Sequence, residues 1–300
     1  MRPSVAAVIV NWRRAEDTVR AVRSLAGSTQ LVMPIVVDNG SGDGSAAKMR
    51  AALPDAEVLE SEANLGFGGG CNVGISRARE LGARYVLLLN NDTEAVEPDF
   101  LTALVEALES DPRAAVAGPL VHFPDGSVQP TVGRLPSFRY AVRLAVDRPR
   151  GAAPLVPGGR VRAEFLAGVC LLVRVEALVQ VGGFDETYFM YGEEADLEGR
   201  LADAGWSLVF VPVRSIIHHH QDVSDDPVAQ VQIRAGFVRF CLDHRGSVSG
   251  AAVAAWFLVG ALSRDLRRRR WFEVPALAGA LGALHSQRGV RRRPAPPPVR

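Results

Sequence analysis

Short apolar runs alternate with amphipathic stretches as far as residue 122, and this alternation limits the folds open to the chain. The apolar runs are rich in β-branched side chains, as buried strands are, and lie at 5–10, 35–38, 85–89 and 115–121. The stretches between them have helical spacing and lie at 15–25, 44–53, 68–81 and 98–108. Strands that alternate with helices form a mostly parallel sheet with helices on both faces, so we expect an α/β fold.

The regular alternation ends near residue 123. The stretch 124–162 is rich in Pro, Gly and Arg, which predicts loops and an irregular subdomain. Beyond it we expect strands at 165–174 and 207–213 and helices at 193–205 and 228–242. These patterns divide the chain into a domain at 1–225, with halves at 1–122 and 123–225, a helical extension at 226–286, and a basic, Pro-rich tail at 287–300 that we expect to be disordered.

The three cysteines, Cys71, Cys170 and Cys241, are widely spaced and form no CxxC pair. This usage argues against a disulfide framework and a zinc cluster, and it favours a reducing, cytoplasmic location. The apolar run at 5–10 is too short for the core of a signal peptide, so we assign it to the first strand. With 48% hydrophobic and 22% charged residues among 300, the chain has the composition of a globular protein with a substantial core.

Basic charge is concentrated at the C-terminal end. Residues 263–300 contain ten Arg against Asp265 and Glu273, a surplus of +8, which leaves −7 on residues 1–262. Two apolar runs, of 13 residues at 250–262 and 14 at 271–284, flank an Arg-rich segment. Both are shorter than the ~20 residues that span a bilayer. Two interpretations stay open: a peripheral contact with an anionic membrane surface, or a helical hairpin packed on the body of the protein.

Polar residues follow the predicted strands, at the edge where open α/β sheets bind ligands. Asn11 follows the first strand, DNGSGDGS at 38–45 ends the second, and NNDT at 90–93 follows a later one. Between them lies the run NLGFGGGCN at 64–72, which matches neither the dinucleotide fingerprint nor a phosphate loop. Its glycines would let the backbone pass close to a nucleotide. Asn90 and Asp92 could together hold a hard divalent cation.

One further run, GFDETYFMYGEEADL at 183–197, sets acidic residues among apolar and aromatic ones. A solvated acidic surface is not interleaved in this way, whereas a concave site with a carboxylate base is. On a helix, Glu193 and Asp196 share a face while Glu194 points elsewhere, so we expect these acids to divide their roles. Asp185 and Glu186 fit a structural role as helix or turn caps better.

Together these motifs resemble those of glycosyltransferase family 2, the inverting class with a GT-A fold, and within it the bacterial rhamnosyltransferase-type members. The resemblance covers about residues 11–224 and is carried by VIVNW at 8–12, VDNGS at 37–41, LNNDT at 89–93, the runs at 64–72 and 183–197, and the histidines 218–220 followed by Ser224. It implies a site for a nucleoside diphosphate sugar. The contacts it implies are Asn11, Asp38, Ser41, Asn64, Gly66, Asn72 and, next to the metal, Asn90.

The resemblance also implies a metal site and a base. The family's Asp-x-Asp motif matches residues 90–92, and because Asn90 replaces the first Asp, binding of Mg²⁺ or Mn²⁺ rests mainly on Asp92. A histidine after the last strand often completes the site, and spacing to Ser224 favours His219, with His218 as second choice. The catalytic pair matches Glu193 and Glu194, which makes Glu194 the implied general base and leaves Glu193 and Asp196 as alternatives.

The implied function is transfer of a sugar to a hydroxyl of a cell-envelope glycan or polyprenyl-linked acceptor at the cytoplasmic face of a membrane, with no nucleic-acid partner. The resemblance favours a dTDP-linked deoxysugar such as dTDP-rhamnose as donor, with a UDP-sugar second. Two alternatives stay open. A sugar-phosphate nucleotidyltransferase would need a glycine-rich loop after the first strand, which residues 11–14 lack. A non-catalytic nucleotide-sugar or glycan-binding protein would keep the pocket without the base.

Overall fold

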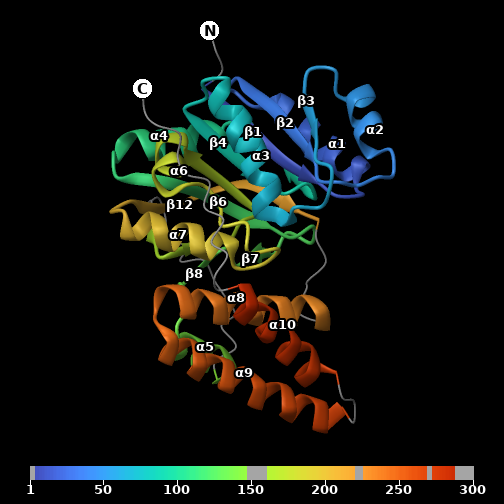
Figure 1. Cartoon of the computed structure of the whole chain (residues 1–300). Helices are drawn as coiled ribbons and strands as arrows, with labels where there is room; N and C mark the ends of the chain where they lie inside the picture. The colour runs from blue at the N-terminus through green and yellow to red at the C-terminus, as the bar shows by residue number, and fades with distance from the viewer. Residues whose placement is uncertain (1–3, 147–160, 220–225, 269–271, 288–300) are drawn as a thin grey trace.

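The computed structural model describes residues 4–146, 161–219, 226–268 and 272–287. A sheet with its covering helices forms the upper body in Figure 1, and a layer of helices lies below it. The strand and helix alternation predicted for the first part of the chain is confirmed, because each predicted element there overlaps an observed one.

A mixed sheet forms the centre of the body, with strand order β3-β2-β1-β4-β11-β6-β12-β5. Neighbours from β3 to β4 are parallel, as are β6 and β12, whereas β11 runs antiparallel to β4 and β6. The predicted, mostly parallel sheet is therefore confirmed. Its main strands are β1 (Val5–Asn11), β2 (Val32–Asp38), β3 (Glu57–Glu60), β4 (Tyr85–Leu89), β5 (Thr93–Ala95), β6 (Ala114–His122), β11 (Cys170–Arg174) and β12 (Ser207–His218).

Helices cover both faces of this sheet, because successive strand side chains point to opposite sides. In β1, Val5, Ala7 and Ile9 pack in the core beneath α1, α2 and α4, whereas Ala6 and Val8 pack in the core beneath α3, α6 and α7. The covering helices are α1 (Ala15–Ser24, followed by a 3₁₀ turn at Leu25–Gly27), α2 (Ser45–Ala52), α3 (Gly66–Glu80), α4 (Phe100–Ser110), α6 (Val175–Val181) and α7 (Glu193–Asp203).

Several strands differ from the sequence-based expectation, among them β5, which was not predicted. β3 was missed because Glu57 and Glu60 flank only two apolar residues, at the edge of the sheet. The single strand predicted at 165–174 is two strands, β10 (Phe165–Leu166) and β11, which pair with different partners. β12 continues past residue 213 to His218, because its last residues pair with both β5 and β6.

A layer of helices packs beneath the sheet body (Figure 1). It consists of α8 (Pro227–His244), α9 (Ser247–Arg268) and α10 (Glu273–Gln287), with α5 (Phe138–Val146) against α9. Ala195 of α7 packs in one core with Phe240 of α8 and Val253 of α9, which fastens the layer to the body. The apolar runs predicted at 250–262 and 271–284 fall in α9 and α10, and both helices pack on α8, as the hairpin interpretation predicted.

The irregular stretch between β6 and β11 is only partly described. It contains β7 (Val128–Gln129), which pairs with β6, β8 (Val132–Gly133), which pairs with β10, and β9 (Val161–Ala163), which pairs with β12. Residues 147–160 lie outside the described residues. So does 288–300, and the disorder expected for the tail stays a prediction.

Candidate functional site

A cavity of about 380 Å³ lies at the carboxyl ends of β1 and β4, and residues 190–194 close it from the other side. Its volume is within the usual range for small-molecule sites. It is lined by Val10, Trp12, Arg14, Asn39, Asn64, Gly66, Phe67, Asn90, Asn91, Asp92, Gln129, Ala167, Gly168, Val169, Met190, Tyr191, Glu193, Glu194 and His218. Six of the residues predicted for the site are in this lining: Asn64, Gly66, Asn90, Asp92, Glu193 and Glu194.

The predicted contacts Asn11, Asp38 and Ser41 lie behind the cavity wall instead. Asn11 is the last residue of β1, in register with Asp38 of β2, and both are buried. Asp38 Oδ1 accepts hydrogen bonds from Asn11 Nδ2 at 2.6 Å and from Ser41 Oγ at 2.5 Å. Ser41 Oγ also accepts from the Arg13 backbone N–H at 2.9 Å. This network fixes the turn after β1, which brings Trp12 and Arg14 to the cavity.

Asn39 orders the loop that carries Asn64 and Gly66. Its Nδ2 donates to Asn64 Oδ1 at 3.1 Å and to Gly66 O at 2.9 Å, and its Oδ1 accepts from the Leu65 N–H at 3.0 Å. At Gly66, where φ is +76°, a Cβ would lie 2.2 Å from the carbonyl oxygen of Phe189. Only glycine permits this approach, which joins the loop to the acidic segment at 183–197.

Two glycines at or just beyond the glycine-rich run serve packing on β1, while the expectation that the run borders a nucleotide stays a prediction. A Cβ at Gly70 would lie 2.8 Å from Val10 Cγ1, and one at Gly74 would lie 2.3 Å from Val8 Cγ1. These glycines let α3 lie directly on β1. Asn72 is also outside the cavity lining: its Nδ2 donates to Phe184 O and Glu186 Oε1, and its Oδ1 accepts from the Phe184 N–H.

Asp92 and His218 meet because β5 pairs with the end of β12, where His218 is in register with Thr93. His218 Nε2 lies 3.1 Å from Asp92 Oδ1, and His218 Nδ1 lies 2.9 Å from Gln129 Oε1. The two ring nitrogens of His218 are thus held between an amide and a carboxylate, with Nε2 turned to Asp92.

His219, the first choice from the sequence, points away from the cavity. Neighbouring strand residues project to opposite sides, and His219 Nε2 lies 3.1 Å from Glu94 Oε2. The order of preference is therefore reversed, with His218 beside Asp92. His220 and Ser224, on which the spacing argument relied, lie outside the described residues.

The pair of Asp92 and His218 fits a cation that takes few protein ligands. The described residues contain no group of three or more His, Cys, Asp or Glu arranged to hold a metal. Mg²⁺ and Mn²⁺ sites in enzymes that bind phosphates commonly use one or two carboxylates and complete their shell with water and phosphate oxygens. Histidine ligands of metals commonly hold their other ring nitrogen in a hydrogen bond, as the contact of His218 Nδ1 with Gln129 does. The donor set therefore suits a cation shared with a diphosphate.

Glu193 and Glu194 are the first two residues of α7, so their side chains leave the end of the helix and both line the cavity. This corrects the expectation that Glu193 and Asp196 share a face. Glu194 Oε2 accepts from the Gly192 N–H at 3.2 Å. Burial raises the pKa of Glu194 above its ordinary value, and burial together with the charge of Glu194 raises the pKa of Glu193 well above it. Within the described residues, Glu193 Oε2 is buried and accepts no hydrogen bond.

Asp196 points to α8 and does not line the cavity. Its Oδ2 lies 2.7 Å from Arg200 Nη2, and its Oδ1 lies 2.9 Å from His244 Nε2. Burial would raise the pKa of Asp196, but the hydrogen bond from His244 and the charge of Arg200 hold it below its ordinary value. Asp185 accepts from the Thr187 N–H at 2.9 Å, which agrees with its expected structural role.

Several lining residues were missed from the sequence. Trp12 and Arg14 directly follow Asn11, and that position was the available signal. Arg14 Nη1 lies 3.7 Å from Asp92 Oδ2, so a cation already sits beside the carboxylate. Gln129 comes from the irregular stretch, where no pattern marked it. Tyr191 adopts a left-handed φ of 66°, which only the structure reveals.

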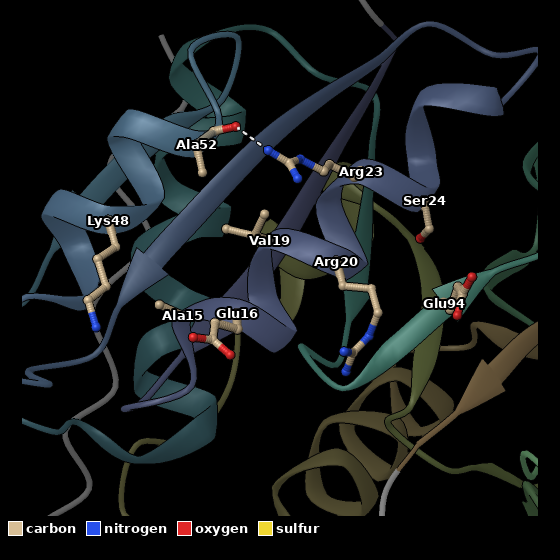
Figure 2. A pocket seen from close by; sticks show the side chains of 9 residues that line it. All are labelled: Ala15, Glu16, Val19, Arg20, Arg23, Ser24, Lys48, Ala52 and Glu94. Carbon is tan, nitrogen blue, oxygen red and sulfur yellow. Dashed lines mark hydrogen bonds between the residues drawn. The ribbon is translucent and has the colours of Figure 1, made fainter.

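A larger hollow of about 610 Å³ lies between α1, α2 and β5 (Figure 2). Two of its arginines are engaged with nearby protein groups: Arg23 Nη2 donates to the Ala52 carbonyl at 3.2 Å (Figure 2), and Arg20 pairs with Asp17. None of the residues predicted for the site lines it. Its size alone therefore does not make it the candidate site.

Comparison with known proteins agrees with this geometry. The sequence pattern described as "Glycosyl transferase family 2" matches residues 6–167. An N-acetylglucosaminyl-diphospho-decaprenol L-rhamnosyltransferase of Mycobacterium tuberculosis is 34% identical over 277 residues, covering 85% of this chain and 89% of that protein. A pre-mycofactocin glycosyltransferase of the same organism is 28% identical over 287 residues, covering 92% of this chain and 56% of that protein.

Solved structures resemble the fold. A mannosyltransferase of Pyrobaculum calidifontis, solved in complex with GDP-Man and Mn²⁺, superimposes with a TM-score of 0.57. The superposition covers 95% of this chain and 76% of that one, at 16% sequence identity. The expected GT-A fold is thus confirmed, with a mostly parallel central sheet flanked by helices and a helical C-terminal part.

Proposed function

Because the chain is a glycosyltransferase that belongs to glycosyl transferase family 2, we propose that it transfers a sugar, with inversion, from a nucleoside diphosphate donor to a hydroxyl of a lipid-linked glycan. Membership of this family sets aside the two alternatives left open by the sequence, a sugar-phosphate nucleotidyltransferase and a non-catalytic binding protein. The cytoplasmic location expected from the cysteines stays a prediction.

One observation carries the proposal: a pair of carboxylates and a group of residues suited to stabilise a diphosphate face the same cavity. Glu193 and Glu194 form one wall, and Asp92, His218 and Arg14 lie in the lining with them. An inverting transfer needs a base on one side of the anomeric carbon and stabilisation of the leaving diphosphate on the other. The arrangement supplies both groups within one cavity of about 380 Å³.

Glu194 is the proposed base. It takes the proton of the acceptor hydroxyl while that oxygen bonds to the anomeric carbon, and the bond from that carbon to the diphosphate oxygen breaks with its electron pair. Burial raises the pKa of both carboxyl groups, and their proximity makes it costly for both to be ionised at once, so one of the pair holds a proton while the other is free to act as base. A protonated Glu193 can donate a hydrogen bond to the acceptor or donor sugar.

The donor half of the cavity comes from the first strands. Asn64, Gly66 and Asn39 present amide and backbone groups, and Trp12 offers an apolar ring beside them. Asn11, Asp38 and Ser41 act behind this wall by fixing the turn. Arg14 lies where it can pair with a diphosphate oxygen. A Mg²⁺ or Mn²⁺ ion held by Asp92 and His218, with Asn90 beside them, would neutralise charge on the departing diphosphate.

The substrate classes rest on the relatives. The mycobacterial relative is named as a rhamnosyltransferase that acts on a GlcNAc-diphospho-polyprenol, and it matches most of this chain. This supports a dTDP-rhamnose-like donor, with a UDP-sugar second, and a polyprenyl-linked acceptor. The lipid-linked acceptor supports work at a membrane surface.

The test combines donor binding with turnover. The thermal shift of the full chain is measured with dTDP-rhamnose and UDP-sugars, with Mn²⁺ or Mg²⁺ and then with chelator. Transfer to a GlcNAc-diphosphate with a short prenyl chain is then followed for wild type and Glu194→Gln. We expect the variant to bind donor as wild type does and to lose turnover by about 10²- to 10⁴-fold. Near wild-type turnover at saturating substrates would show that Glu194 is not the base.

The variants Glu193→Gln and Asp196→Asn separate the alternatives. Neither should match the loss of turnover in Glu194→Gln, because a Gln at 193 still offers the sugar a hydrogen-bond donor and Asp196 is paired with Arg200 and His244 outside the cavity. If Asp196→Asn alone abolished turnover without loss of stability, Asp196 would have to be the base.

A further inference from the structure

Helix α9, at the bottom of the helical layer in Figure 1, carries a stripe of exposed apolar side chains along most of its length. The stripe consists of Val248, Ala251, Ala255, Val259, Leu262 and Leu266, all of which are exposed. Val248, Val259 and Leu266 are 87%, 64% and 66% exposed, which is rare for such side chains in a packed helix. These residues are three or four positions apart, so they lie on one face over ~27 Å of helix.

The opposite face of α9 is occupied by the protein itself. Val253 and Ala261 are fully buried and belong to the cores shared with α8 and α10. At the end of the helix, the Asp265 carboxylate accepts from the Glu273 and Val274 N–H groups, and Arg264 pairs with Glu273. The stripe is therefore the outward face of a helix already held in place on its inner side.

The stripe lacks the charge that the exposed face of α1 carries. Residues 248–262 contain no charged side chain, whereas the exposed face of α1 carries Glu16, Arg20 and Arg23. An apolar surface of this length marks a docking site on a protein. Positive charge begins at the C-terminal end of the stripe, where the sequence has four arginines at 267–270.

We propose that the α9 stripe docks this protein on an anionic lipid surface, with α9 lying in the membrane interface. Charge decides between a lipid surface and a second copy of the chain. The segment from 263 onward carries a surplus of +8 while residues 1–262 carry −7. Anionic headgroups would neutralise the arginines at the end of α9, whereas the stripe of a second copy, which carries no charge at residues 248–262, offers them no anionic partner.

The helix lies in the interface and does not span it. Among the described residues, α9 is the helix long and apolar enough to cross a bilayer by length and composition. Its inner face, however, packs on α8 and α10 through buried side chains, and spanning would expose those contacts. A helix with one apolar face, one occupied face and basic residues at its end is typical of interfacial binding.

This inference rests on the proposed function, because a protein that acts on a lipid-linked acceptor has to reach that acceptor at a membrane surface. Its test does not depend on turnover. Binding of the full chain to vesicles reports on the stripe, and transfer to a short-chain acceptor in solution reports on the cavity.

The experiment measures sedimentation of the full chain with phosphatidylcholine vesicles, with and without phosphatidylglycerol. The test variant replaces Val259 and Leu266 by Ser, which removes apolar area without changing charge. The matched control is Leu31→Ser, since Leu31 is 65% exposed in the loop before β2. We expect wild type and control to bind anionic vesicles more tightly than neutral ones, and the stripe variant to bind about tenfold more weakly or worse.

Thermal unfolding confirms that the variants fold, and all three proteins should transfer to the soluble acceptor at equal rates. The proposal is overturned if the stripe variant binds anionic vesicles as wild type does, or if wild type does not bind them. It is also overturned if sedimentation velocity without lipid shows a wild-type dimer that the stripe variant loses. Vesicle binding without any transfer would contradict the proposed function alone.

Discussion

Replacing Gly236 by Ala tests whether the helical layer positions the catalytic pair. Gly236 lies in α8, far in sequence from Glu194, yet its backbone touches the segment that leads into α7. An added Cβ would lie 2.1 Å from the Tyr191 carbonyl oxygen, 3.0 Å from the Tyr191 carbonyl carbon and 3.4 Å from Gly192 Cα. These atoms are backbone, so no side-chain rotation can relieve the contact.

The size of the effect follows from these distances. Ordinary carbon contacts begin near 3.4 Å, so the segment at 191–192 has to retreat by about 1 Å. Tyr191 and Gly192 have left-handed φ values of 66° and 101°. Because Glu193 is the next residue, a displacement of this segment also moves the glutamates that line the cavity. A misplacement of ~1 Å costs about 10²-fold in rate. The helix itself gains up to ~1 kcal/mol from Ala, which partly offsets an overpacking cost of ~1–3 kcal/mol.

The assay measures kcat at saturating donor and soluble acceptor, together with thermal unfolding. The control is Gly279→Ala in α10, where an added Cβ meets nothing within 4 Å and only the helix-propensity gain remains. We expect Gly236→Ala to lose about 10²-fold in kcat with a modest change in stability, and Gly279→Ala to keep wild-type kcat. Wild-type kcat in Gly236→Ala would refute the idea that α8 positions this segment.

Three further predictions follow from individual side chains. The folded protein holds the Glu193 proton more tightly than the unfolded chain, so the stability of the wild type falls as pH rises from the ordinary glutamate range toward the raised pKa. Glu193→Gln removes this ionisation, so its gain in Tm over the wild type should be larger near pH 8 than near pH 5. An equal gain at both pH values would contradict this. His218→Ala should abolish the Mn²⁺-dependent thermal shift measured with a nucleoside diphosphate while His219→Ala keeps it, and equal loss in both would rule out this assignment. Asn72→Ala should lower the free energy of unfolding by about 1–3 kcal/mol in denaturant titration and leave donor Kd unchanged, whereas weaker donor binding at wild-type stability would restore a nucleotide contact.

The acidic segment shows how far sequence reasoning reached into the site. Its composition marked the run 183–197 as part of a site, the resemblance to the family singled out Glu193 and Glu194, and both line the cavity. Helical periodicity then misplaced Asp196, because periodicity describes side chains within a helix and these glutamates leave its first turn. Whether an acid faces a ligand or an arginine depends on what packs against the helix. For Asp196, that neighbour is His244 of α8, 48 residues further along the chain.

The histidines 218 and 219 at the end of β12 also show that tertiary contacts decide which side chain faces the site. Motif spacing favoured His219 over His218, but spacing does not show to which side of a strand each of two consecutive residues points. Pairing of β12 with β5 decided the matter by placing His218 against Asp92, 126 residues away.

The sequence by itself determined the layered α/β architecture, the polar strand ends and the family, because these depend on local periodicity and on short motifs. Only the tertiary structure decided which polar residues share a cavity, which glycines serve packing, and which face of α9 stays uncovered. Each of those outcomes depends on contacts between segments distant in sequence, where backbone approach and strand register, rather than residue type, select the partners.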